Sequence, residues 1–290
     1  MGLTLFLFPA CTCAQTLYNQ QIVTAIAIIN QKGGVGKTTT AANLSAALAA
    51  AGKSVCMADL DPQGHLSLYF GHEVDHNHAT LYDVLADDVA FADTLVPVRD
   101  KLFLSPSTTD LAAAETILAE RDDRNLILQK SFALKPPTQD FVIFDCPPSL
   151  GLLTINTLSV ADEIIIPLQP HFLALQGLAK LLKTIELVQQ HLNPKLIVRG
   201  ILFCMYETVT RLGRDVVEEV RDFFEASRND DTPWAKARVF QSVIRRNIRL
   251  AEAPSHGKTI FEYDAKSNGA NDYALLANEL LNCYRPTEPS

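Results

Sequence analysis

The chain has 290 residues and a formal net charge of −8 at pH 7. At this length one enlarged α/β domain is as plausible as two small ones. Hydrophobic residues make up 48% of the chain and charged residues 20%, which is ordinary for a globular protein. The acidic balance argues against a globally basic nucleic-acid binder, and no apolar run approaches the length of a membrane span. Six cysteines in so long a chain predict reduced thiols rather than a disulfide framework.

The first 21 residues have an apolar start and a Cys-x-Cys pair at Cys11 and Cys13, with no lysine or arginine. A secretory signal peptide needs a basic n-region, and two cysteines without a second pair make a poor metal site. We therefore expect residues 1–21 to be a disordered extension or a start-site artefact. Residues 22–285 are then a single domain, and residues 286–290 are a tail.

The first organising feature is a strand, a glycine-rich turn and a helix. Val23–Ile29 is apolar and β-branched, as buried parallel strands are, and Thr38–Gly52 is typical of an Ala-rich helix that ends at a glycine. The glycines between them let backbone N–H groups converge on an anion at a helix N-terminus. Because Lys37 can reach the β- and γ-phosphates and Thr38 can ligate Mg²⁺, the stretch predicts a magnesium-nucleotide site. The expected nucleotide-binding residues of this loop are Lys32, Gly33, Gly34, Val35, Gly36, Lys37, Thr38 and Thr39.

The loop departs from the strict pattern G-x-x-x-x-G-K-[ST], because Gln31 takes the place of the first glycine and a second lysine, Lys32, stands at its entrance. The wording KGGVGKTT over residues 32–39 resembles the deviant Walker A motif of the ParA/MinD ATPases. The resemblance implies that Lys32 crosses a dimer interface to the partner's nucleotide and acts in catalysis together with Lys37. The alternative is a glycine turn whose lysines only add solubility.

Two aspartates end the next predicted strand, before a loop that contains Pro62 and Gly64. Ligands of open α/β sheets sit at the carboxyl ends of strands, so Asp59 and Asp61 should face the same nucleotide. One of them could orient the attacking water and the other could support Mg²⁺. The run DLDPQG resembles the family's second motif, which implies that Asp61 positions the water and leaves Asp59 to the metal. A capped loop with solvated acids is the alternative.

A third informative stretch is Phe141–Gly151, where four apolar residues end in Asp145. This is the Walker B pattern, in which the carboxylate holds Mg²⁺ through water. The following CPPSLG resembles the family's switch region, whose prolines fix a loop that can sense the γ-phosphate. Cys146 has no identifiable partner base, so we interpret it as a small buried thiol.

Elsewhere the sequence is less informative. Four histidines at positions 65, 72, 76 and 78 lack the regular spacing of metal ligands, so a solvated loop is the preferred interpretation. The remaining expected elements are helices at Thr80–Leu85, Ala112–Arg121, Phe172–His191 and Asp215–Phe224, strands at Leu102–Leu104, Glu163–Gln169 and Leu196–Met205, and a terminal helix to about Tyr284.

The segment Val239–Lys258 resembles a family segment near the adenine and the dimer edge, which implies that Met205, Arg246 and Asn247 contact the nucleotide. The resemblance also implies that Arg249 helps to hold nonspecific DNA. A second DNA-binding arginine of the family is replaced by Val209. Arg211 or Arg214 are the candidates to take its place, and Arg245, at a position that is usually proline, adds positive charge near Arg249. Ala226–Arg238 is a polar insertion that we interpret as a loop.

The resemblance runs from Val23 to Tyr284 and is specific to the ParA or Soj partitioning ATPases. It implies one doubly wound α/β domain, with a mostly parallel sheet of about seven or eight strands and helices on both faces. It further implies a slow ATPase that uses Mg²⁺ and ATP, forms a homodimer on ATP binding and binds nonspecific double-stranded DNA. Hydrolysis, stimulated by a ParB/Spo0J-type partner, would reset the dimer, in the cytoplasm and at the nucleoid.

Three alternatives remain. A MinD-type membrane-associated ATPase needs a basic amphipathic C-terminal helix, whereas Asn271–Asn282 has no lysine or arginine. A redox ATPase like the nitrogenase iron protein needs exposed cysteines, whereas Cys56, Cys146 and Cys204 fall in or beside predicted strands. A ParA-like ATPase that positions a cargo other than DNA has no discriminating sequence feature.

Overall fold

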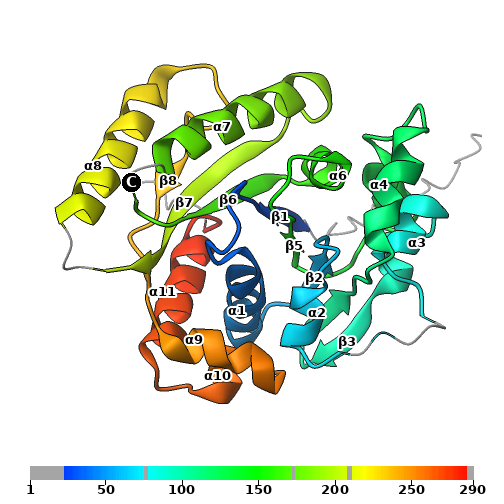
Figure 1. The fold of residues 1–290 in the computed structure, drawn as a ribbon, viewed down its shortest axis with the longest axis horizontal. Helices are drawn as coiled ribbons and strands as arrows, with labels where there is room; N and C mark the ends of the chain where they lie inside the picture. The colour runs from blue at the N-terminus through cyan, green and yellow to red at the C-terminus, as the bar shows by residue number, and fades with distance from the viewer. Residues whose placement is uncertain (1–22, 73, 75–77, 172–173, 208–210, 286–290) are drawn as a thin grey trace, which may run out of the picture.

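The computed structural model describes residues 23–72, 74, 78–171, 174–207 and 211–285, which form a central β-sheet between two layers of helices (Figure 1). The strand order is β3-β4-β2-β5-β1-β6-β7-β8, and β9 also pairs with β7. Every pair is parallel except β3 with β4. The strands are β1 (Thr24–Ile28), β2 (Val55–Asp59), β3 (Val96–Arg99), β4 (Leu102–Ser105), β5 (Phe141–Asp145), β6 (Glu163–Leu168), β7 (Ile197–Tyr206), β8 (Arg238–Val239) and β9 (Ile244–Arg245).

The inner strands are buried on both faces, which explains their apolar, β-branched sequences. Every residue of β2, β5 and β6 is buried, and so is β1 after its first residue. Along β1, Ala25 and Ala27 contribute to one hydrophobic core, whereas Ile26 and Ile28 contribute to the other, as the alternation of a strand requires. Each face of the sheet therefore needs its own helical cover.

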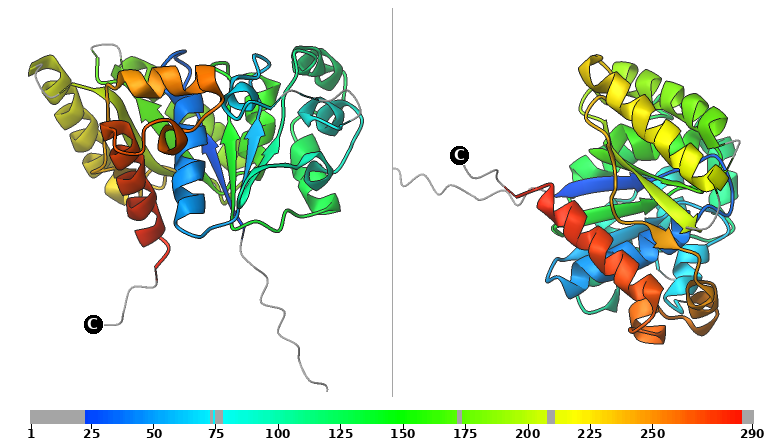
Figure 2. Two further views of the ribbon diagram at one scale, coloured as in Figure 1. Left: turned by 90° about the horizontal axis from the view of Figure 1, so that it is seen from below. Right: turned by 90° about the vertical axis from the view of Figure 1, so that its left-hand side faces the viewer.

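Two groups of helices supply that cover, and Figure 2 shows them on opposite sides of the sheet. One core is closed by α3 to α8, and the other by α1, α2, α9, α10 and α11. No helix in the described ranges is long and apolar enough to cross a bilayer. The α-helices are α1 (Lys37–Ala50), α2 (His65–Tyr69), α3 (Leu81–Ala86), α4 (Leu111–Ala119), α5 (Ile127–Leu134), α6 (Leu152–Val160), α7 (Ala174–His191), α8 (Arg211–Ala226), α9 (Ile248–Glu252), α10 (Ile260–Tyr263) and α11 (Asn268–Asn282); the 3₁₀ turns are η1 (Phe91–Thr94), η2 (Ser227–Asn229) and η3 (Ala253–His256).

The topology brings the predicted motifs to one edge of the sheet. Strands β2 to β5 lie on one side of β1 and strands β6 to β8 on the other, so the carboxyl end of β1 is a topological switch point. Asp145, at the end of β5, is in register with Ile28 of β1 on one side and with Asp59 of β2 on the other. The loop after β1 and the two aspartates therefore lie side by side at the carboxyl edge of the sheet.

The predicted doubly wound α/β fold is confirmed, and the sheet of the described residues has nine strands, against the seven or eight expected. The three strands that the sequence analysis did not name individually are β3 and the two-residue strands β8 and β9, and the last two are too short to give a periodic pattern. In the insertion 226–238, Ala226 ends α8 and η2 follows; the chain then passes beside β7, where Val198 N–H donates to Pro233 O at 2.8 Å. The expectations for residues 1–21, 286–290, Phe172, His76 and Val209 fall outside the described residues.

Candidate nucleotide site

The loop between β1 and α1 supplies a backbone cradle. Gly34 and Gly36 have φ angles of 72° and 94°, in the left-handed region that favours glycine. Gly36 immediately precedes α1, and no side chain caps this helix or places an acidic group in its first turn. The first N–H groups of α1 and the positive end of its dipole therefore suit an anion.

Lys37 lies buried beneath this loop, with 7% of its surface exposed. Its Nζ donates to the backbone carbonyl of Lys32 at 3.4 Å. Burial lowers the pKa of Lys37, although the nearby carboxylates of Asp145 and Asp61 act in the opposite direction. A cation that is partly stripped of water and held beside the cradle is suited to contact phosphate oxygens.

Asp59 and Asp145 are fully buried at the ends of adjacent strands. One oxygen of Asp59 accepts the N–H and the hydroxyl of Ser67, both at 2.9 Å. The other oxygen of Asp59 and both oxygens of Asp145 have no hydrogen-bond partner among the described residues. Burial raises the pKa of Asp59 to about 7, and burial together with the neighbouring Asp59 raises the pKa of Asp145 well above its ordinary value. Buried carboxylate oxygens left in this way are costly unless a cation completes the site.

The residues present fit magnesium. Carboxylate and hydroxyl oxygens are the hard ligands that Mg²⁺ prefers, and the hydroxyl of Thr38, in the first turn of α1, lies near enough to favour the charged form of Asp145. The described residues contain no group of three or more His, Cys, Asp or Glu side chains that could hold a metal alone. Thr38, Asp145 and Asp59 could therefore hold Mg²⁺ directly or through water, with phosphate oxygens as the remaining ligands.

Asp61 occupies the turn that follows β2. Its Oδ1 accepts the N–H of Gln63 at 3.0 Å, and its carbonyl accepts the N–H of Gly64 at 2.9 Å, so the side chain is held by a local turn. The carboxylate is close enough to Lys37 to oppose, in part, the lowering of the pKa of that lysine by burial. A half-buried, ionisable carboxylate at this edge is suited to orient a water against a bound phosphate.

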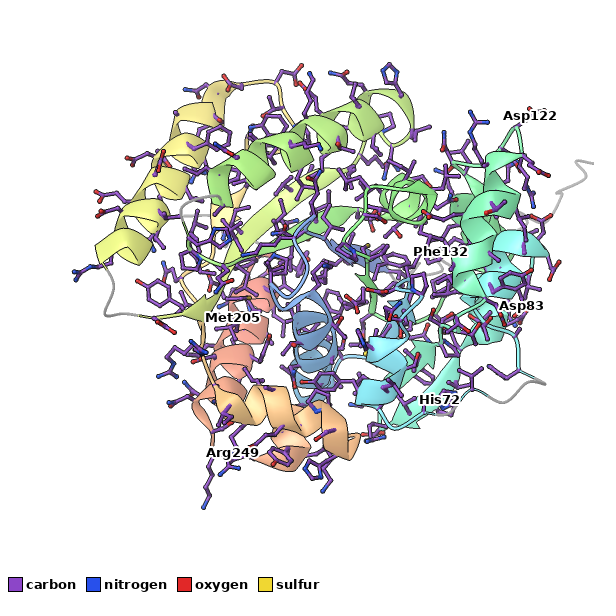
Figure 3. The ribbon with its side chains drawn as sticks, viewed as in Figure 1. His72, Asp83, Asp122, Phe132, Met205 and Arg249 are labelled. Carbon is purple, nitrogen blue, oxygen red and sulfur yellow. The ribbon has the colours of Figure 1, made fainter. Side chains whose placement is uncertain are left out.

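A cavity of about 350 Å³ opens beside the loop, between the end of β7 and α9. It brings Met205, Arg246 and Asn247, the three predicted nucleotide contacts outside the loop, together with Gly36 and Thr39. Met205 lies at the end of β7 (Figure 3) with a φ of 52°, which is uncommon for a residue with a side chain. Most of the cavity wall is apolar, as the flat faces of a nucleobase require.

Three comparisons with known proteins agree with this geometry. A family model described as an AAA domain matches residues 23–198. The sporulation initiation inhibitor protein Soj of Bacillus subtilis is 44% identical over 256 residues, which cover 88% of this chain and 97% of that protein. The chromosome partitioning protein ParA of Myxococcus xanthus is 43% identical over 265 residues, which cover 91% of this chain and 90% of that protein. The chain belongs to the ParA/Soj family of partitioning ATPases.

A solved structure of higher divergence shares the fold. Cobyrinic acid a,c-diamide synthase from Mycobacterium smegmatis superposes with a TM-score of 0.75 at 36% identity, covering 91% of this chain and 96% of that one. That protein was crystallised with ADP and magnesium, and also with an ATP analogue and magnesium. A ligand of the type predicted for the ParA/Soj site is thus bound by a protein of the same fold.

The arginines near the end of the chain differ in their surroundings. Arg246, expected at the nucleotide, donates to Glu207 at 3.0 Å, and Arg249, on α9 (Figure 3) and expected to bind DNA, donates to Glu252 at 2.9 Å; both pairs are largely exposed. Arg214 is exposed on α8, whereas Arg211 begins that helix and its side chain lies outside the described residues.

Arg245 is held by a buried carboxylate. Its guanidinium forms a bidentate pair with Asp272 of α11, whose side chain is only 4% exposed, and its backbone N–H donates to the same carboxylate at 3.0 Å. The positive charge that the sequence predicted beside Arg249 is therefore balanced within the fold. The pair of Arg245 with Asp272 fastens the segment 245–249, which carries three arginines and is called the arginine-bearing segment below, to α11.

Several contacts around the site were not predicted from the sequence. Ser67 holds Asp59, and Asn30 accepts the backbone N–H of Lys32 at 2.9 Å. The ammonium of Lys32 lies 2.6 Å from Nε2 of His171, in the connection between β6 and α7. Because β6 neighbours β1, the run PLQPH at its carboxyl end was the available signal that this connection reaches the site.

Proposed function

We propose that this ParA/Soj-family chain is a magnesium-dependent ATPase that switches between a free subunit and an ATP-bound dimer. The observation that carries the proposal is the pair of buried carboxylates, Asp59 and Asp145, whose unpartnered oxygens lie beside an uncapped glycine cradle and a buried Lys37. A bound Mg²⁺ would neutralise phosphate charge. Thr38 and Asp145 would hold the ion, with Asp59 in support, and Lys37 would contact the β- and γ-phosphates.

Hydrolysis is assigned to two further residues. The Asp61 carboxylate orients a water in line with the γ-phosphate, since its turn holds it at the same edge of the sheet. Lys32 is exposed at the loop entrance and can therefore extend to the phosphates of a second subunit, where it stabilises negative charge in the transition state. Slow turnover and stimulation by a ParB/Spo0J-type protein belong to the same proposal.

The DNA-binding surface of the dimer is proposed to use Arg246 and Arg249 with Arg214 and Arg211, while Arg245 fastens the segment. A single copy of this surface is weak, because Glu207 and Glu252 balance two of its charges. Two copies side by side bind the phosphate backbone by avidity, without base readout. The protein then acts in the cytoplasm at the nucleoid, in chromosome or plasmid segregation.

The membrane alternative is less well supported. In α11 the apolar residues Tyr273, Leu276 and Leu280 are buried against the core that contains α1, and the helix has no lysine or arginine. A membrane-binding helix needs an available apolar face with basic residues beside it. ATP-dependent sedimentation of the full chain with anionic liposomes would restore this alternative.

The testing experiment is binding of the full chain to nonspecific duplex DNA with ATP, with ADP and with no nucleotide, across a salt series. We expect binding only with ATP, and a steep loss of affinity as salt rises. Arg249→Ala should lower the salt slope by about two, because the dimer loses two phosphate contacts. Arg228→Ala is the matched control, since Arg228 also forms an exposed ion pair with a glutamate three residues away, Glu225. ATP-dependent dimerisation without DNA binding would instead favour a non-DNA cargo.

A further inference from the structure

The side chain of Lys32 is engaged within its own subunit. Its ammonium lies 2.6 Å from Nε2 of His171, a residue 139 positions away in the connection between β6 and α7. An ammonium can only donate, so the imidazole nitrogen in this contact must be the acceptor and His171 must be neutral. The contact is therefore a charge-assisted hydrogen bond of defined direction.

The backbone of Lys32 is held at the same connection. Asn30 accepts the Lys32 N–H at 2.9 Å, and the Asn30 amide donates to the carbonyl of Pro167 at 2.7 Å. The loop entrance is thus fixed to the end of β6, and His171 follows Pro167 by four residues. The position of the Lys32 ammonium is consequently set by β6 and the residues that follow it, rather than by the nucleotide cradle alone.

The space around this contact allows the lysine to leave. A cavity of about 230 Å³ lies between the loop entrance and the start of α7, where Ala174 and Gly177 contribute little bulk. Lys32 itself is exposed. Among the described residues, the cavity therefore leaves room for the exposed Lys32 side chain to turn away from His171.

We propose that His171 is a positioning residue that holds Lys32 within its own subunit, and that breaking this contact is a step in forming the dimer. The proposal rests on the proposed function, in which Lys32 reaches the phosphates of the partner. The two positions of the side chain are alternatives in this proposal, because a Lys32 that extends out of its own subunit toward the partner's phosphates moves its ammonium out of hydrogen-bond range of His171. The His171 contact therefore competes with dimerisation and sets the ATP-bound subunit concentration at which dimers form.

Proton binding would open the contact. Burial, with a contribution from Lys32, lowers the pKa of His171 below its ordinary value, so the imidazole is neutral near pH 7. Below that lowered pKa, His171 and Lys32 are two neighbouring cations and repel each other. The other described residues that line the cavity are uncharged, so Lys32 is the charged group facing His171 from the loop side.

The test is the dimer dissociation constant of the full chain, measured by analytical ultracentrifugation with Mg²⁺ and a nonhydrolysable ATP analogue. A hydrogen bond to a charged group corresponds to about a tenfold change in an equilibrium constant. We expect His171→Ala to lower the dissociation constant by about tenfold. His171→Gln, which keeps a neutral acceptor, should stay near the wild-type value.

Two further measurements separate this role from a merely structural one. In the Lys32→Ala background His171→Ala should have no effect, because the competing contact is already gone. Wild-type dimerisation should also strengthen as the pH falls below 6.5, relative to His171→Gln, because the lowered pKa of His171 places its protonation there. An unchanged dissociation constant in His171→Ala, or an equal change in the Lys32→Ala background, overturns the proposal. If the wild-type chain forms no dimer with the analogue, the proposed function itself fails, which is a distinct result.

Discussion

Asn43 and Ile260, 217 residues apart, are joined by a buried hydrogen bond in which Asn43 Oδ1 accepts the Ile260 N–H at 2.8 Å. The Asn43 amide also donates to the Tyr69 hydroxyl and to the Thr39 carbonyl, both at 2.8 Å, and its side chain is fully buried. The Asn43 side chain of α1 thus joins α1 to both α2 and α10. Helix α2 follows the Asp61 turn, and α10 follows the arginine-bearing segment. The nucleotide helix and the proposed DNA surface belong to one rigid arrangement through this contact.

Replacing Asn43 by alanine should lower the free energy of unfolding by about 2–4 kcal/mol, because two buried groups, the Ile260 N–H and the Tyr69 hydroxyl, lose their partner. Urea denaturation of the purified chain measures the change. Ser45→Ala is the matched control on the same helix, since the buried Ser45 hydroxyl has no hydrogen-bond partner among the residues that the structure describes and its removal should cost little. Equal stability of the two variants would contradict the role assigned to Asn43.

Asp145→Asn should have opposite effects on the protein with and without its ligand. Without nucleotide we expect the free energy of unfolding to rise by on the order of 1 kcal/mol, because burial disfavours the ionised form of Asp145 and an uncharged amide does not carry this cost. With Mg²⁺ and ATP, the increase in melting temperature seen for the wild type should be largely lost, because binding of a ligand stabilises a fold only while affinity remains. Thermal unfolding in both conditions provides the check, and an undiminished ligand shift would remove Asp145 from the magnesium site.

Alanine variants of the neighbouring Arg245 and Arg246 should differ in their effects, with the first lowering the stability of the fold and the second weakening DNA binding. Arg245→Ala leaves the Asp272 carboxylate buried and without its guanidinium, so we expect a loss of about 1–3 kcal/mol of unfolding free energy, measured in urea. Arg246→Ala removes an exposed pair with Glu207 and should cost at most about 1 kcal/mol, while weakening ATP-dependent DNA binding. Similar unfolding free energies for the two variants would mean that Asp272 does not depend on Arg245.

The parts of the site that the sequence predicted are those whose position follows from local rules. The glycine loop lies between a strand and a helix that are contiguous with it, and Asp59 and Asp145 end apolar strands whose carboxyl ends must share one edge of a parallel sheet. The doubly wound fold follows from the same alternation of strands and helices. The residues expected to bind Mg²⁺ and phosphate could therefore be predicted without knowledge of long-range packing.

The parts that were not predicted depend on which distant elements become neighbours. His171 reaches Lys32 only because β6 pairs with β1, and Asn43 reaches Ile260 only because the C-terminal segment folds back over α1. The charge of Arg245 was predicted as available, yet its balance by Asp272 depends on α11 packing beside β9. No periodicity or motif encodes these three relationships.

Asp61 should be required for hydrolysis and not for ATP binding. Asp61→Ala removes both the carboxylate charge and the acceptor of the Gln63 N–H, whereas Asp61→Asn keeps an oxygen that can preserve the turn. If the charge orients and polarises the water, phosphate release should fall by about a hundredfold or more in both variants, while nucleotide affinity stays within a few-fold of the wild type. Because hydrolysis resets the proposed dimer, both variants should also remain dimeric and bound to DNA after ATP addition. Near wild-type phosphate release from Asp61→Asn would show that only the turn matters, and the water-positioning role would then pass to another group.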